Sequence, residues 1–144
     1  MARMSGSGEN PQQQITQQQL VNLVPFSGVV GVRLVSAVPE QVKGRLEWSQ
    51  ERCTAGGVLH GGALMTMADT LGALCAFLNL PPGSQTSTIE SKTNFFRAVR
   101  NGHVEGVSRP LHAGRSTIVV QTDLFDAEGG HIAQTTQTQA VIGG

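Results

Sequence analysis

Residues 60–80 read HGGALMTMADTLGALCAFLNL, and this stretch decides the fold. Apolar side chains recur at the i, i+3, i+4, i+7 spacing of a helix, at Leu64, Met67, Ala68, Leu71, Leu74, Cys75 and Leu78. A second face carries small residues and one carboxylate, namely Thr66, Asp69, Gly72, Ala73 and Ala76. We expect a helix that is apolar on one face and small on the other to be buried on both. Pro81-Pro82-Gly83 predicts its end.

The segments around this helix predict a tail, a short helix and a set of strands. Residues 1–14 hold almost no apolar side chains, which predicts a disordered tail, and residues 15–24 have near-helical apolar spacing that ends at Pro25. Runs rich in Thr, Val, Ile and Phe predict strands at 29–38, 42–49, 85–96, 103–111, 115–126 and 131–142. Short connections at 97–102, 112–114 and 127–130 are interpreted as hairpins between antiparallel neighbours. The sequence therefore predicts one α+β domain over residues 15–144, an antiparallel sheet curled over one long central helix.

The composition excludes several classes of function. The chain has 144 residues, of which 39% are hydrophobic and 14% charged, as in one globular domain. Ten Lys and Arg balance ten Asp and Glu, so the basic excess of a nucleic-acid-binding protein is missing. We expect no membrane span, because no apolar run reaches about 18 residues, and no secretory signal. A cytoplasmic protein that hides part of its surface in an oligomer fits this composition.

Signatures of nucleophilic, metal and phosphate-loop chemistry are missing from the sequence. It contains neither GxSxG nor SxxK. Cys75 falls on the apolar stripe and is predicted to be inert core, whereas Cys53 has no His–Asn pattern that would make it a nucleophile. The four histidines are far apart in the chain and lack HExxH spacing, and no P-loop or dinucleotide fingerprint occurs. We therefore expect no metal and no bound cofactor.

Candidate chemistry concentrates at the predicted long helix. A carboxylate at Asp69 is either satisfied by a neighbouring group or acts as a general base or nucleophile whose pKa burial raises. Gly61 and Gly62 open the helix, where unpaired backbone N–H groups and the positive dipole end can hold an oxyanion. The alternative to an oxyanion site is that the two glycines only make the start of the helix flexible.

The spacing of these candidates favours a site between subunits. His60 and Asp69 are nine positions apart, which puts them on roughly opposite sides of one helix and about 13 Å apart along it. A single chain therefore does not easily bring its Gly61 amide and its Asp69 to one small carbonyl group. If the two act together, we expect Gly61 from one chain and Asp69 from another.

Several motifs together resemble the hotdog-fold acyl-CoA thioesterases. They are GVLHGG at 57–62, ADT at 68–70, FFR at 95–97, GVSRPLHAGR at 106–115 and FDAEG at 125–129. The similarity covers about residues 20–143 and points to the branch of the phenylacetate-pathway, 4-hydroxybenzoyl-CoA (Arthrobacter-type) and 1,4-dihydroxy-2-naphthoyl-CoA thioesterases. It implies a sheet wrapped around one helix, hydrolysis of coenzyme A thioesters, and a homodimer or a dimer of dimers.

The resemblance also implies roles for individual residues. Asp69 would be the base or nucleophile, and the Gly61 amide would polarise the thioester carbonyl. His60 would orient the loop or contact the thioester region. Ser87 matches a position that places the water or the carboxylate in some members, and Thr54 stands at a position that helps to bind the carbonyl or the water. Substrate and coenzyme A contacts are implied at Gly62, Phe95, Arg97, Gly114, Arg115, Ser116 and Thr117. Arg97 and Arg115 can equally be ordinary surface charges at turns.

Departures from the family pattern keep two rival functions open. Thr54 stands where relatives often carry Gln or Asn, Ala73 stands where some carry Thr or Ser, and Phe95-Phe96 replace a paired His. Menaquinone-branch members have Glu in place of Asp69. The rivals are a non-catalytic acyl-CoA-binding module and a hotdog enoyl-CoA hydratase, although the Asp–His pair of the hydratases is missing here. Leu64, Met65, Phe95 and Phe96 either line an apolar acyl pocket or belong to the core.

Overall fold

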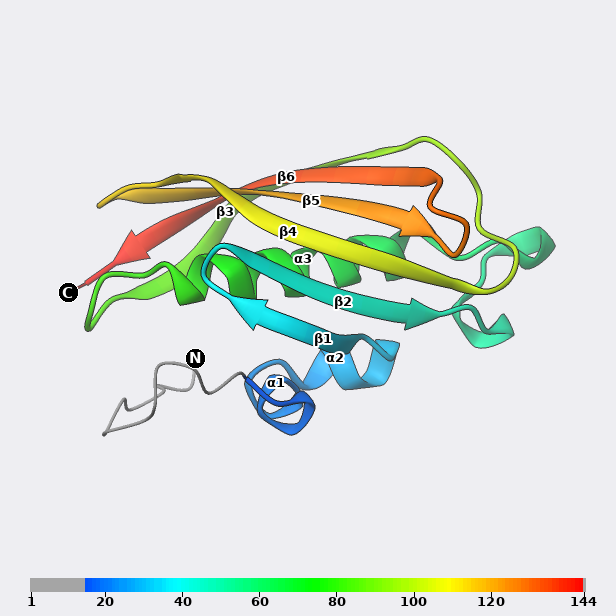
Figure 1. The fold of residues 1–144 in the computed structure, drawn as a ribbon, viewed down its shortest axis with the longest axis horizontal. Helices are drawn as coiled ribbons and strands as arrows, with labels where there is room; N and C mark the ends of the chain where they lie inside the picture. Colours follow the sequence, from blue (N-terminus) through cyan, green and yellow to red (C-terminus); the bar gives the residue numbers. More distant parts are fainter. Residues whose placement is uncertain (1–14, 144) are drawn as a thin grey trace.

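A computed structural model describes residues 15–143 of the chain as one curved sheet around a long helix (Figure 1). The α-helices are α1 (Gln17–Leu23), α2 (Pro25–Val30) and α3 (Gly61–Leu78). The strands are β1 (Arg33–Val38), β2 (Gln41–Glu47), β3 (Gln85–Phe95), β4 (His103–Ala113), β5 (Thr117–Asp126) and β6 (His131–Ile142). The predicted α+β class, the long helix and the six strands are confirmed, and the predicted tail at 1–14 lies outside the described residues.

The sheet order is β1-β2-β4-β5-β6-β3, and every neighbouring pair is antiparallel, as predicted. The interpretation of residues 97–102 as a hairpin is wrong. β3 pairs with β6 at one edge of the sheet, whereas β4 lies beside β2, so residues 97–102 cross over the sheet end between them. The pairing of β3 with β6 extends over the whole length of β3, from Gln85 to Phe95.

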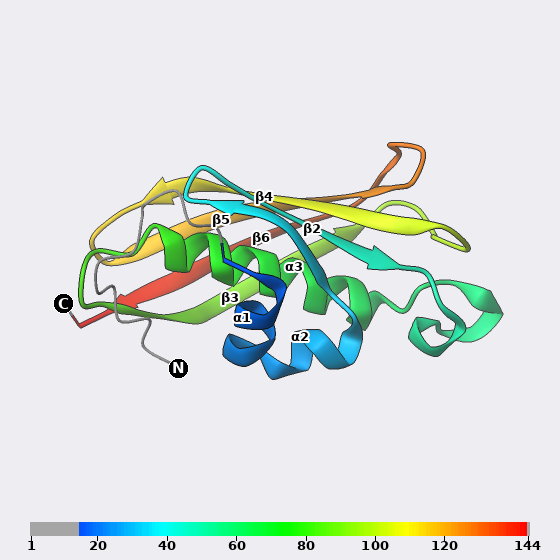
Figure 2. The ribbon, with the colours of Figure 1, turned by 60° about the horizontal axis from the view of Figure 1, so that its bottom comes forward.

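α3 runs through the concave side of the sheet and contacts all six strands (Figure 2). Two glycines paired across β2 and β4, Gly44 and Gly106, let the helix approach closely. A Cβ at either position would come within 2.7 Å of a Leu71 methyl carbon. The side chain of Leu71 is completely buried against them, which fixes the height of α3 above the sheet.

The length and hydropathy of α3 correct one expectation from the sequence. With 18 residues and a mean hydropathy of 1.4, α3 is long and apolar enough to cross a membrane, so the expectation that no segment reaches that length is wrong. Half of the helix is buried inside the fold. Its packing against every strand is the environment of a core helix.

The N-terminal elements differ from the prediction around residue 25. Pro25 does not end the helical region but begins a second helix, because proline is well suited to the first helical turn. Helix α2 extends to Val30 and ends at Gly31, whose φ of 95° is left-handed. The predicted strand at 29–38 therefore starts only at Arg33.

Candidate active site

The start of α3 presents an unsatisfied backbone donor. His60 is the N-cap, and its Nδ1 accepts a hydrogen bond of 2.7 Å from the Gly62 amide. Within residues 15–143, the Gly61 amide has no acceptor. This N–H also lies at the positive end of the helix dipole, so it is suited to bind a partly negative oxygen. The three consecutive residues His60, Gly61 and Gly62 thus form the start of α3.

Phe95, the last residue of β3, lies beside the start of α3. A Cβ added to Gly61 would lie 3.2 Å from Phe95 Cζ, so the ring stands over the helix start. The ring is nevertheless half exposed to solvent. Phe95 is therefore an exposed aromatic side chain beside the start of α3, and its role near the substrate stays a prediction.

Asp69 lies two turns along α3 and is exposed in the single chain, as is Met65 one turn before it. The expectation that the helix is buried on both faces is therefore wrong for one chain. Asp69 Oδ1 accepts a hydrogen bond of 3.3 Å from Gln137 Nε2 of β6. Neighbouring groups desolvate the carboxyl and raise its pKa, and the bond from Gln137 lowers the pKa by less. A raised pKa suits a general base.

Gln137 is the residue of this arrangement that the sequence analysis missed. The stretch QTTQTQ at 134–139 is polar on both faces, so period-two alternation did not mark any of its side chains as buried. In the structure Thr135, Gln137 and Gln139 all point inward and are almost completely buried. The signal that could have found Gln137 is the small face of α3, which leaves room for a polar side chain opposite Gly72.

The remaining candidates are divided between the two ends of the sheet. Phe95 and Arg97 lie at the end where α3 begins, with the Arg97 guanidinium against Gly130 in the β5–β6 turn. The predicted contacts at Gly114, Arg115, Ser116 and Thr117 lie in and beside the β4–β5 turn, at the other end of β5. Ten residues of β5 separate the two ends by about 30 Å. One chain therefore does not bring these two groups together.

Ser87 and Thr54 do not approach Asp69 in the single chain. Ser87 pairs with Ala140, on the sheet face opposite to the one that carries Gln137, so it points away from α3. Thr54 is exposed in the loop before the helix, where its backbone N–H donates to the Val58 carbonyl at 2.8 Å. The loop itself is two short 3-10 helices, Gln50–Arg52 and Ala55–Gly57.

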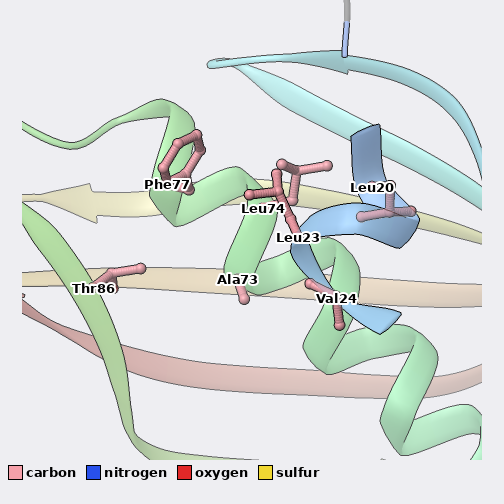
Figure 3. Close-up of a pocket in the computed structure, with 7 residues that line it drawn as sticks. All are labelled: Leu20, Leu23, Val24, Ala73, Leu74, Phe77 and Thr86. Carbon is pink, nitrogen blue, oxygen red and sulfur yellow. The ribbon is translucent and has the colours of Figure 1, made fainter. Parts of the chain in front are cut away.

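Two hollows adjoin α3. An apolar pocket of about 90 Å³ lies between α1, α3 and β3 (Figure 3), lined by Leu20, Leu23, Val24, Ala73, Leu74, Phe77 and Thr86. Ala73 is one turn beyond Asp69, so the pocket continues the helix face that carries the carboxylate. A second hollow, of about 500 Å³, adjoins His60 and Gly62 and is bounded by α2 on its other side.

The other titratable and nucleophilic groups offer little alternative chemistry. Cys75 lies in the core, as predicted, and burial raises the pKa of its thiol to about 11, which makes it a poor nucleophile. Among residues 15–143, no three His, Cys, Asp or Glu side chains lie close enough to hold a metal ion. The chemistry available to this chain therefore centres on Asp69 and the start of α3.

Comparisons with known proteins agree with the fold. Residues 56–133 match the model of the thioesterase superfamily. Over 60% of the chain it is 33% identical to the proofreading thioesterase EntH of Cronobacter sakazakii and to the 1,4-dihydroxy-2-naphthoyl-CoA hydrolase of Escherichia coli. These alignments span 64% and 63% of the two relatives' lengths. A thioesterase structure from Haemophilus influenzae superposes with a TM-score of 0.82 at 25% identity, over 91% of this chain and 93% of that one.

Proposed function

Because the chain belongs to the thioesterase superfamily and has its hotdog fold, we propose that it hydrolyses acyl-CoA thioesters to the free acid and coenzyme A. The observation that carries this proposal is a pair of groups on α3. One is the Gly61 amide, which has no acceptor within residues 15–143, and the other is the Asp69 carboxyl, whose pKa is raised. A donor for a developing oxyanion and a carboxylate base are what hydrolysis of a thioester requires.

The reaction follows from these two groups. The Gly61 N–H binds the thioester carbonyl oxygen and stabilises the negative charge that grows there. Asp69 takes a proton from a water molecule, whose oxygen then attacks the carbonyl carbon. The C–S bond breaks, and the coenzyme A thiolate accepts a proton as it leaves. Direct attack by Asp69 would form a mixed anhydride instead, which water would then hydrolyse.

We propose a homodimer as the smallest active unit. β3 is an edge strand of 11 residues, and Ile89 on it is 60% exposed. Long exposed edges of this kind pair with another strand. A second copy across β3 would also cover Asp69 and Met65, which are exposed on the single chain. Pairing of two such dimers into a tetramer extends the same proposal.

In the dimer, the divided candidates act from two chains. Arg97 from one subunit and Gly114, Arg115, Ser116 and Thr117 from another would bind the phosphates and nucleotide of coenzyme A, for which Arg and Ser/Thr donors are suited. Thr54 and Ser87 would place the water or the carbonyl from the partner's side. The two free cysteines fit the reducing cytoplasm that we propose as the location.

The apolar pocket beside Ala73 supports an apolar acyl group. Its lining has one polar side chain, Thr86, among six apolar ones. An acyl group whose carbonyl carbon lies at Asp69 would reach Ala73 about one helical turn, or 6 Å, further along. We therefore expect aliphatic or unsubstituted aromatic acyl groups to be better substrates than hydroxylated aromatic ones.

The decisive experiment is thiol release from a panel of coenzyme A thioesters with wild type and Asp69→Asn measured together. The panel holds phenylacetyl, 4-hydroxybenzoyl, naphthoyl and aliphatic esters of increasing length. Turnover by wild type, with a loss of at least about 100-fold in Asp69→Asn, supports the proposal. Binding of the esters without turnover would overturn it in favour of a non-catalytic acyl-CoA-binding module, and hydration of an enoyl-CoA would favour a hydratase.

A further inference from the structure

Gln137 is a buried amide whose hydrogen bonds are only half used. Its side chain is completely buried on the inner face of β6. Nε2 donates to Asp69 Oδ1 at 3.3 Å, whereas the buried Oε1 has no partner within residues 15–143. Buried polar atoms almost always find a partner, so an unpartnered carbonyl oxygen beside a carboxylate calls for an explanation.

Gly72 makes the space in which this amide lies. A Cβ on Gly72 would come 2.3 Å from Gln137 Oε1 and 2.7 Å from Cδ, so no larger residue fits without moving the amide. Gly72 and Asp69 are three positions apart on α3 and therefore lie on one face. On this face of the helix, Gly72 leaves space for the Gln137 amide, and Asp69 supplies the carboxylate that the amide contacts.

The neighbouring Gln139 shows what a purely structural glutamine looks like in this fold. It is also buried and lies two residues further along β6, on the same face. Its Oε1 accepts from Thr86 Oγ1 at 3.1 Å, and its Nε2 donates to Thr88 Oγ1 at 2.8 Å. Both polar atoms of the Gln139 amide therefore form hydrogen bonds between β6 and β3. The Gln137 amide is bonded to α3 instead.

We propose that Gln137 is a positioning residue for Asp69, whose amide holds the carboxylate by donating from Nε2 and holds the protonated acid by accepting at Oε1. This inference rests on the proposed function, in which Asp69 gains and loses a proton during each turnover. A half turn of the amide about its last side-chain bond exchanges the two atoms. A leucine could make neither bond, and a lysine could only donate.

The environment of Asp69 leaves this control to Gln137. Within residues 15–143, burial and the Gln137 bond are the causes that act on the pKa of Asp69, and no charged side chain contributes. Removal of the Nε2 donor takes away the one group that favours the ionised base. The pKa of Asp69 should then rise, and the fraction of active, ionised enzyme at a given acidic pH should fall.

The test compares Gln137→Met with Gln139→Met in the full-length chain. Each variant removes one buried amide from β6 and keeps its length, so a merely structural role predicts similar effects for both. We expect the acidic limb of the kcat/KM–pH profile to move up by about one pH unit in Gln137→Met only. At a pH well below that limb kcat/KM should fall about tenfold, and at high pH it should recover.

A second measurement separates this inference from the proposed function. The chain has three aspartates, so ¹³C labelling of Asp gives three carboxyl signals whose titration is followed by NMR without any substrate. The Asp69 signal, assigned by its loss in Asp69→Asn, should titrate at higher pH in Gln137→Met and in Gly72→Ala, which displaces the amide. An unchanged Asp69 titration in both variants overturns the positioning role, whether or not wild type shows turnover. A shifted titration in a protein that hydrolyses no thioester would overturn the proposed function alone.

Discussion

The ring of Phe95 stands over Gly61, close enough that a Cβ on the glycine would lie 3.2 Å from Phe95 Cζ. This contact joins the end of β3 to the start of α3. Along the chain, the two positions are separated by the 18 residues of the helix and the 11 residues of the strand. Because the ring is half exposed to solvent, the size of the side chain at either position should affect how closely a ligand can approach the start of α3.

The first prediction concerns this contact between Phe95 and Gly61. Gly61→Ala should lower kcat/KM by about 10- to 100-fold, because the added methyl group presses on the Phe95 ring and narrows the approach to the amide. Phe95→Leu should weaken activity modestly by itself. In the double variant, the smaller leucine makes room for the alanine, so part of the lost activity should return. Steady-state kinetics of the four proteins form a double-mutant cycle, and purely additive effects would show that the contact does not control access.

The second prediction concerns the N-cap of α3. His60→Ala should lower the free energy of unfolding by about 1 kcal/mol, because the Gly62 amide loses its acceptor at Nδ1. His60→Asn keeps a side-chain acceptor at this position and should lose much less. Urea unfolding followed by the fluorescence of the only tryptophan, Trp48, measures both. Equal losses in the two variants would mean that the hydrogen bond contributes nothing.

Local patterns predicted most of the elements but not their order in the sheet. The bounds of the long helix were predicted within a few residues, because its apolar spacing and the proline pair after it are local signals. The crossover at 97–102 could not be predicted, since whether β3 pairs with β4 or β6 depends on contacts between residues distant in sequence. The helix at Pro25–Val30 was missed because a proline is equally compatible with the end of one helix and the start of the next.

For the candidate site, the catalytic roles of Gly61 and Asp69 stay predictions, whereas the structure tests where the residues lie. Gly61 begins α3 and Asp69 lies inside it, as the helical spacing predicted. The large distance between Arg97 and Arg115 could not be predicted, since it depends on which turns lie at the same end of the sheet. Gln137 was invisible because burial of a glutamine depends on the residue opposite it, here Gly72, rather than on its own neighbours in the chain.

The third prediction concerns Asp123 on the outer face of β5. Burial raises the pKa of Asp123, but bonds from Gln134, Gln121 and His131 outweigh it and hold the pKa below its usual value. The folded state therefore binds this proton more weakly than the unfolded chain. The resulting stability is present above the unfolded pKa of about 3.8 and is lost as the pH falls through the lower folded pKa.

Asp123→Asn should accordingly lower the free energy of unfolding near neutral pH by about 1 kcal/mol and weaken its decline in acid. Urea unfolding at several pH values between about 2.5 and 7 measures how steeply the free energy of unfolding of wild type and of the variant depends on pH. A variant whose stability falls with acid as steeply as that of wild type would assign the pH dependence to other carboxyls.

The fourth prediction follows from the distance between the two groups that we propose to be catalytic. Gly61 and Asp69 are eight residues apart on one continuous helix, which corresponds to about 12 Å. That span exceeds the reach of a single carbonyl group and its attacking water. An active site that uses both must therefore take them from different chains, and the proposed homodimer would hold two equivalent sites.

Mixed dimers distinguish a shared site from one that lies within a single chain. Asp69→Asn and Gly61→Val, each expected to be nearly inactive, are unfolded together and refolded in equal amounts. If sites are shared, each mixed dimer holds one site with both defects and one with neither, and random pairing makes about a quarter of all sites intact. If each chain carries its own complete site, every site keeps a defect and mixing restores nothing. Two different affinity tags on the variants allow the mixed dimers to be isolated, so that a lack of recovery in that fraction counts against sharing rather than against exchange.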